Sequence, residues 1–98
     1  MTTDATGDDG HERTVTIRNQ RGLHARAAAK FVRTVESFDA EVTVLKDDVR
    51  VPGTSIMGLM MLAAGPGTTL YLHATGADAA GVLDALAELV ARGFDEDA

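Results

Sequence analysis

The stretch Arg21-Gly22-Leu23-His24-Ala25-Arg26 separates a strand pattern from a helix pattern. Before it, Thr14-Val15-Thr16-Ile17-Arg18 alternates polar residues with β-branched apolar ones, which predicts a half-buried strand. Gly22 breaks this alternation. From Ala25 to about Ser37 the apolar residues recur at helical spacing and predict an amphipathic helix, with Ala28, Phe31, Val32 and Val35 on its apolar side.

The rest of the chain shows three further strand patterns and two further helix patterns. The predicted strands are 41–46, 49–51 and 69–74, and the predicted helices are 56–63 and one that follows Gly76-Ala77-Asp78. The last helix has a regular apolar stripe formed by Val82, Leu83, Leu86, Leu89 and Val90. The order is β-α-β-β-α-β-α, and every strand has one apolar face. We therefore expect an α+β fold in which helices cover one face of a four-stranded antiparallel sheet.

The length of 98 residues and the apolar content of 45% fit one globular domain. We expect that domain at residues 12–94, between a disordered acidic tail at 1–11 and a fraying acidic tail at 95–98. The chain has no cysteine, which excludes disulfides, thiolate metal sites and cysteine nucleophiles. Since no signal peptide or membrane-spanning stretch is recognisable, we expect a cytoplasmic protein with no membrane insertion.

The charge is unevenly distributed along the chain. The net charge of −6 argues against a nucleic-acid partner, which would call for a basic surface. Six of the nine cations nevertheless lie between Arg13 and Arg33, and this segment contains no acidic residue. A run of solvated charges on one strand and one helix would explain it without a function. Because His24 lies at its centre, we favour a landing site for an anion or for an acidic partner face.

His24 is the candidate reactive residue. A neutral imidazole can attack a phosphoryl donor, and its covalent product can pass the group onward. A helix that begins here offers unpaired N–H groups at Ala25 to Ala27 as a phosphate cradle, and the Gly22 turn would present the ring to solvent. The Arg26 guanidinium could pair with phosphate oxygens. In an arbitrary chain, a histidine that merely begins a helix would be the better explanation.

Ser55 precedes the short apolar helix and is predicted to be its N-cap. A phosphate added there would be compatible with the helix dipole and would place negative charge beside the apolar residues that follow. This makes Ser55 a candidate regulatory site.

The short helix contains Met57, Met60 and Met61, of which we expect at least one in the core. So apolar a helix cannot bury every face in a small domain. We therefore predict a partner surface formed from Ile56, Met57, Leu59 and Met60.

Other polar residues do not suggest a site. His11 and His73 have no metal-ligand spacing to His24, and Asp47-Asp48 is explained by a turn. No glycine-rich nucleotide loop is present, and we expect neither a metal nor a cofactor.

Two motifs together resemble the histidine-containing phosphocarrier protein HPr of the bacterial phosphoenolpyruvate-dependent phosphotransferase system. They are Gly22-Leu23-His24-Ala25-Arg26 and Ser55-Ile56-Met57-Gly58-Leu59-Met60, and the similarity extends from about Arg13 to Phe94. The family fold is an open-faced β-sandwich, with three helices on one face of four antiparallel strands.

The resemblance implies a specific role for each motif. Enzyme I, charged by phosphoenolpyruvate, would phosphorylate Nδ1 of His24, and Arg26 would stabilise the phosphate. The group would pass to a histidine on an enzyme IIA domain. The chain would thus be a stoichiometric phosphocarrier, not a turnover enzyme. Ser55 matches the serine that the HPr kinase/phosphorylase modifies in some members, and the apolar residues after it match the docking surface.

Two departures from the family pattern matter. Ala27 stands where the family usually has proline, which leaves the helix viable but loosens its start. Thr54 stands where many serine-regulated members have a cation, which weakens the case for kinase recognition. The segment before Ser55 and the Met-Met-Leu-Ala-Ala run look closer to the nitrogen-related regulatory branch than to sugar uptake.

Two alternatives differ in class from a phosphocarrier. One is a regulatory module that binds partners through the methionine helix and is switched at Ser55, with His24 idle. The other is a small hydrolase with His24 as base, which the motif disfavours because it contains neither a nucleophile nor an orienting acid. No second apolar stripe calls for another copy, so we expect a monomer.

Overall fold

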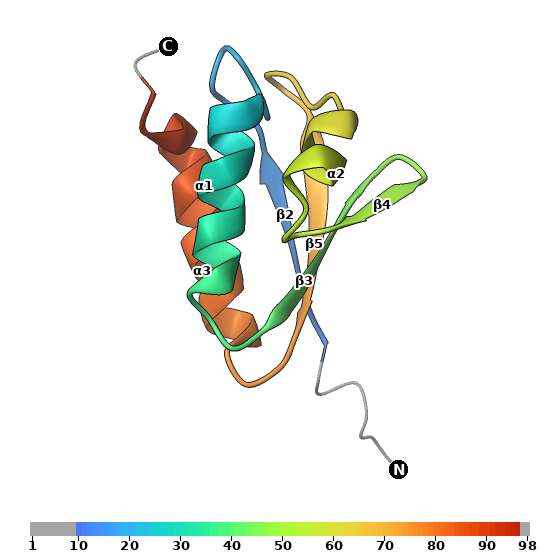
Figure 1. Ribbon diagram of the computed structural model, residues 1–98, viewed down its shortest axis with the longest axis vertical. Helices are drawn as coiled ribbons and strands as arrows, with labels where there is room; N and C mark the ends of the chain where they lie inside the picture. The colour runs from blue at the N-terminus through green and yellow to red at the C-terminus, as the bar shows by residue number, and fades with distance from the viewer. Residues whose placement is uncertain (1–9, 97–98) are drawn as a thin grey trace.

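The computed structural model describes residues 10–96, so most of the predicted N-terminal tail (1–9) and residues 97–98 lie outside the described range. Strands and helices follow the predicted order (Figure 1). They are β2 (His11–Thr16), α1 (Ala25–Glu36), β3 (Glu41–Lys46), β4 (Val49–Pro52), α2 (Ile56–Met61), β5 (Thr69–Thr75) and α3 (Ala79–Ala91), followed by the 3-10 turn η2 (Gly93–Asp95). The predicted α+β fold is confirmed.

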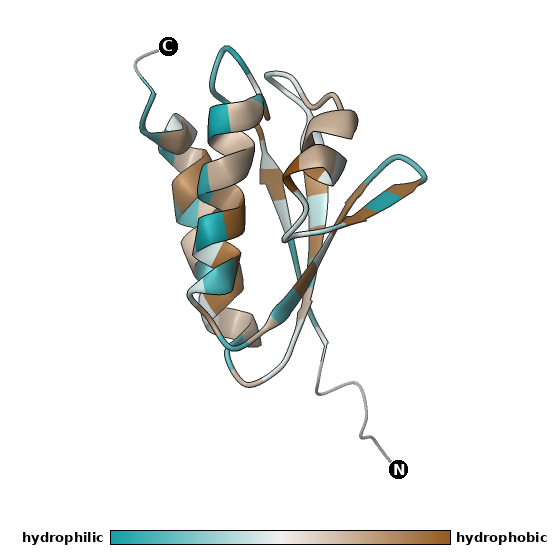
Figure 2. Cartoon of the chain, in the orientation of Figure 1, coloured by the Kyte–Doolittle hydropathy of each residue, from teal (hydrophilic) through white to brown (hydrophobic). Residues whose placement is uncertain are grey.

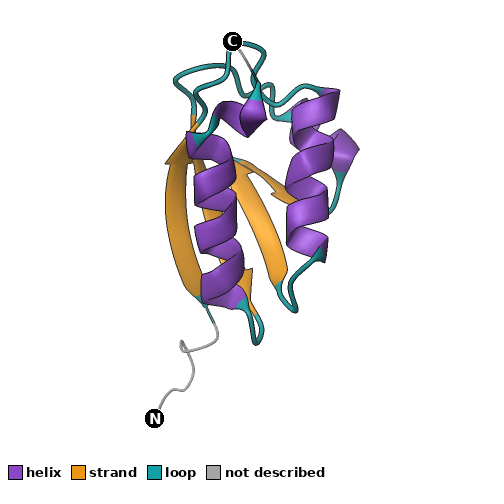
Figure 3. Cartoon of the chain, turned by 90° about the vertical axis from the view of Figure 1, so that its left-hand side faces the viewer, coloured by secondary structure: helices purple, strands orange, loops and turns teal. Residues whose placement is uncertain are grey.

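The strands form one antiparallel sheet in the order β2-β5-β3-β4. The register places Val15 opposite Leu70, and Leu72 opposite Val44. These four side chains are buried beneath the helices, which lie on one face of the sheet (Figure 3). Tyr71, between the two leucines of β5, is 56% exposed on the other face, as the alternation of side chains along a strand requires.

The core lies between the sheet and the helices, where the apolar sides of α1 and α3 meet the strands (Figure 2). All five residues of the predicted α3 stripe are buried, as are the four predicted apolar residues of α1. Phe31 on α1 and Phe94 in η2 are the largest fully buried side chains. None of the helices in residues 10–96 is long and apolar enough to cross a bilayer.

The largest boundary differences from the prediction are at three places, and β4 and β5 each run one residue beyond their predicted ends, to Pro52 and Thr75. β2 begins at His11, earlier than the predicted Thr14, because His11 pairs with Ala74 of β5. α2 ends at Met61, earlier than the predicted Ala63, because Ala63 has a positive φ of 53°. The C-terminal end does not fray from residue 95 within the described range, since Asp95 belongs to η2 and Glu96 is hydrogen-bonded.

Candidate functional site

His24 occupies the N-cap position of α1, directly before the helix start that the sequence predicts at Ala25. Its backbone is extended (φ −74°, ψ 179°), and its carbonyl accepts the first helical hydrogen bond from the Ala28 N–H at 2.8 Å. The imidazole makes no capping bond, and the side chain is 20% exposed. The first-turn N–H groups of the helix therefore begin next to a ring that solvent can reach.

The turn before His24 is held by Gly22 and Asn19. Gly22 has φ +64° and donates its N–H to the Asn19 carbonyl at 3.1 Å, while the Asn19 amide donates to the Gly22 carbonyl at 2.8 Å. The Leu23 N–H donates to the Ala64 carbonyl at 3.0 Å. Because Ala64 follows α2, this bond ties the His24 loop to the end of that helix.

Glu96 lies against His24, a contact that sequence reasoning missed. The Nε2 atom of His24 is 2.5 Å from Oε2 of Glu96, and the Asn19 amide donates to Oε1 at 2.9 Å. The two residues are 72 positions apart, and no motif links them. One signal was available: Phe94 is a lone large apolar residue in the acidic C-terminal stretch and is fully buried, which fixes the chain just before Glu96.

The surroundings of Glu96 favour its ionised form. Burial opposes ionisation, but the hydrogen bonds from Asn19 and His24 and the charges of His24 and Arg26 outweigh it and lower the pKa of Glu96. The Glu96 carboxylate is thus hydrogen-bonded to the His24 imidazole. Since His24 now has an orienting acid, that objection to a hydrolase no longer holds. The objection from the nucleophile remains: within residues 10–96, the ring is hydrogen-bonded to Glu96 and to no hydroxyl group.

The cations of the basic segment have different neighbours. Arg13 pairs with Asp84 of α3, and the Lys30 ammonium donates to the Phe94 carbonyl at 2.7 Å. Arg26 is exposed on the first turn of α1, and its charge reaches Glu96. Among the cations of the basic segment, Arg26 is therefore the one whose charge helps to lower the pKa of Glu96, the residue in contact with His24.

The remaining residues of the predicted phosphate cradle differ in how exposed they are. Ala25 is exposed at the start of α1, whereas the Ala27 side chain is fully buried in the core. Ala27 can therefore face a ligand only through its backbone. Gly22 is also buried, and its part is to shape the turn.

Ser55 is the N-cap of α2, as predicted, and its Oγ accepts a hydrogen bond from the Gly58 N–H at 2.9 Å.

The predicted partner surface needs a correction. Leu59 is fully buried because it faces the core, and the expectation that one methionine is buried is wrong. The exposed apolar residues of α2 form what we call the methionine surface: Ile56, Met57, Met60 and Met61.

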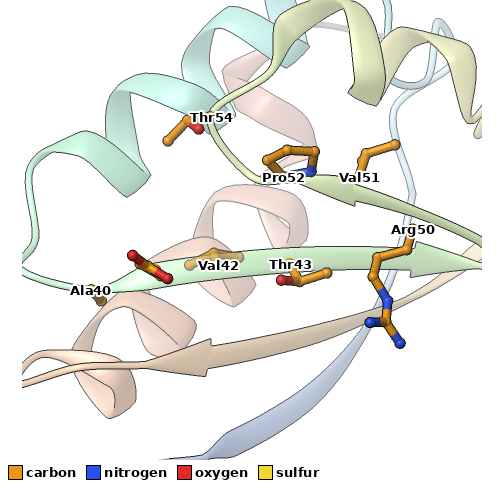
Figure 4. A pocket seen from close by; sticks show the side chains of 8 residues that line it. Ala40, Val42, Thr43, Arg50, Val51, Pro52 and Thr54 are labelled. Atoms are coloured by element: carbon orange, nitrogen blue, oxygen red, sulfur yellow. The ribbon is translucent and has the colours of Figure 1, made fainter.

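A pocket lies away from His24, between β3, β4 and the turn that leads to α2 (Figure 4). Its charged lining residues are Glu41 and Arg50, and no predicted site residue lines it.

His11 and His73 lie on β2 and β5. In the described part of the chain, no three His, Asp or Glu residues are grouped closely enough to hold a metal ion.

The sequence matches the family described as "PTS HPr component phosphorylation site" over residues 11–92. It is 49% identical over 85 residues to phosphocarrier protein HPr of Neisseria meningitidis serogroup A, covering 87% of this chain and 96% of the relative. It is 46% identical over 85 residues to phosphocarrier protein NPr of Shewanella violacea, covering 87% and 93%. The crystal structure of HPr-C-His from Thermoanaerobacter tengcongensis superposes with a TM-score of 0.85 at 40% identity, covering 90% of this chain and 99% of that one.

Proposed function

The chain belongs to the HPr family of phosphocarriers of the phosphotransferase system, and from this membership we propose a specific relay. Enzyme I, charged by phosphoenolpyruvate, transfers a phosphoryl group to Nδ1 of His24, and an enzyme IIA domain accepts it on a histidine. The carrier turns over no substrate of its own. It is a cytoplasmic monomer that alternates between free and phosphorylated His24.

The position of His24 as the N-cap of α1 is the observation that carries this proposal. The ring is accessible and does not cap the helix itself, so an added phosphate can approach the N–H groups of the first turn. The helix dipole and the nearby Arg26 both favour negative charge there. A phosphoryl group on His24 would thus be stabilised while it remains exposed at the protein surface, where a partner can reach it.

The methionine surface is the proposed docking site for both partners. Large apolar side chains are exposed at Ile56 (39%), Met57 (70%), Met60 (40%) and Met61 (76%). The hydrogen bond between Leu23 and Ala64 ties this helix to the His24 loop, so one partner face can cover both. Flexible methionine side chains suit a surface that must fit two different partners in turn.

Ser55 is the proposed regulatory site, with an HPr kinase/phosphorylase as the modifying enzyme. Its hydroxyl oxygen caps α2, directly before Ile56 and Met57 of the docking site. A phosphate on Oγ would bring about two negative charges to the edge of an apolar surface, which should weaken docking more than it weakens the fold.

The relay is tested with purified enzyme I, phosphoenolpyruvate and an enzyme IIA domain from the same organism. Phosphorylation of the IIA domain should require this protein and should be lost with His24→Ala. Arg26→Ala, which keeps the histidine, should slow the transfer. If the IIA domain is phosphorylated equally well through His24→Ala, the chain does not act through His24.

A further inference from the structure

Glu96 makes a contact at His24 that the proposed relay does not use. Both of its carboxylate oxygens are engaged: Oε1 accepts from the Asn19 amide at 2.9 Å, and Oε2 lies 2.5 Å from Nε2 of His24. The Glu96 side chain is only 9% exposed. A surface carboxylate would instead be hydrated, so this one is held in place by its surroundings.

The backbone before Glu96 is strained, and contacts with the rest of the protein hold it in place. Gly93, Phe94 and Asp95 have consecutive positive φ values of 65°, 57° and 62°. Only the first is a glycine, and such conformations persist where the surrounding structure holds them. Phe94 is fully buried, and its carbonyl accepts from Lys30 of α1 at 2.7 Å. The C-terminal turn is thereby tied to α1, beside which it lies in Figure 1.

The Asn19 side chain orients the carboxylate. Its amide nitrogen donates to both the Gly22 carbonyl and Glu96. With oxygen and nitrogen exchanged, an amide oxygen would face two other oxygens, so the hydrogen-bond pattern admits one orientation only. Asn19 therefore connects the turn before His24 to the residue that contacts the imidazole.

These contacts indicate which nitrogen of His24 bears the proton when the ring is neutral. An ionised carboxylate can only accept hydrogen bonds, so Nε2 donates whether the ring is charged or neutral. When the ring loses its second proton, the lone pair is left on Nδ1. We propose that Glu96 is a positioning residue that holds His24 as the Nε2–H tautomer, so that Nδ1 is the nucleophile. This inference rests on the proposed function, which takes Nδ1 as the phosphorylated atom.

The transfer step then balances without a proton leaving the ring. The Nδ1 lone pair attacks phosphorus, the Nδ1–P bond forms, and the bond from phosphorus to the donor breaks, with its electron pair going to the donor. The ring gains positive charge as the bond forms. The proton stays on Nε2, and the carboxylate of Glu96 compensates the developing charge, as a carboxylate behind a catalytic histidine does elsewhere.

The tautomer is tested by NMR of protein labelled with ¹⁵N-histidine. The unphosphorylated wild type should show neutral His24 protonated at Nε2, with that proton protected from exchange with water. Glu96→Ala should lose the protected proton, and Glu96→Gln, which keeps one acceptor oxygen for the two donors Asn19 and His24, should protect it less than the wild type does. Asp95→Asn is the matched control: it removes one negative charge at the preceding residue, and asparagine tolerates the positive φ. Protonation of wild-type His24 at Nδ1 would overturn the proposal.

The effect on transfer is measured as the initial rate of phosphorylation by enzyme I. Glu96→Ala should lower it about tenfold, the size expected when a hydrogen bond to a charged group is lost. Glu96→Gln should fall between Glu96→Ala and wild type, and Asp95→Asn should match wild type. An unchanged or faster rate for Glu96→Ala overturns the positioning role while leaving the relay intact. If wild type is not phosphorylated at all, the relay and this role both fail.

Discussion

At the scale of single residues, Gly22 has the least room for a side chain among the glycines of the described chain. A Cβ added there would lie 2.2 Å from the Ala64 carbonyl oxygen, and the φ of +64° is unfavourable for any side chain. Gly22→Ala should lower the free energy of unfolding by about 3 kcal/mol, measured by urea denaturation.

The matched control for Gly22 is Gly67→Ala. Gly67 also has a positive φ, +87°, but a Cβ added there would point into open space, with no other part of the chain within 4 Å. This variant bears the backbone strain without the collision and should lose only about 1 kcal/mol. Equal losses in the two variants would contradict the steric explanation.

Glu96 should make stability depend on pH. Its pKa is lower in the folded than in the unfolded chain, so its contribution is present above the ordinary glutamate pKa and is lost as the pH falls through the lowered value. Denaturation of wild type and Glu96→Gln should differ most at about pH 7, and the gap should shrink towards about pH 3. A gap that stays constant over this range would argue against an ionised Glu96 in the fold.

The sequence predicts the position of His24 but not its contact with Glu96. The position of His24 at a helix start followed from Gly22 and the apolar spacing after it, both of which act locally. Glu96 could not be found in this way, because its contact joins residues 72 positions apart through the buried Phe94. Phe94 signals that the acidic chain end is anchored, but the local sequence does not indicate which residues it contacts.

At the scale of elements, α2 depends on Ser55 for its start. Ser55→Ala removes the hydrogen bond to the Gly58 N–H and should cost about 1 kcal/mol in thermal or urea unfolding. Ser55→Asp keeps a capping oxygen and should be nearly as stable as wild type, yet it should weaken docking of enzyme I through its charge. If Ser55→Asp loses as much stability as Ser55→Ala, the capping role is wrong.

The two faces of α2 should respond differently to substitution. Met57→Lys and Met61→Lys alter exposed side chains, so they should leave the unfolding free energy nearly unchanged and raise the KM of enzyme I for the carrier. Leu59→Ala should destabilise the fold by about 3 kcal/mol, because it empties a fully buried position. A Met57→Lys variant with an unaltered KM would remove Met57 from the docking surface.

The elements themselves were largely predictable from the sequence. Alternation gave β3 its bounds, and the apolar stripe of α3 is buried as expected, since both patterns report a single covered face. The burial of individual α2 residues was not predictable. This helix has only six residues and almost no polar side, so its hydropathy does not tell Leu59 from the methionines.

At the scale of the whole molecule, the site is assembled from both ends of the described chain. The turn after β2 supplies Asn19 and His24, the segment after α2 anchors Leu23, and the turn after α3 supplies Glu96. The pairing of β2 with β5 brings the turn after β2 beside the segment after α2, and the hydrogen bond from Lys30 to the Phe94 carbonyl ties the turn after α3 to α1. His24 therefore acquires its surroundings only in the folded protein.

The proposed relay depends on phosphorylation of His24, which is measured as intact mass after incubation with phosphoenolpyruvate and the native enzyme I. The wild type should gain the mass of a single phosphoryl group, and acid should remove it. His24→Ala, verified as folded, should gain none. Persistence of the added mass in His24→Ala, or its absence from wild type while a known carrier is phosphorylated in parallel, would contradict phosphoryl transfer through His24.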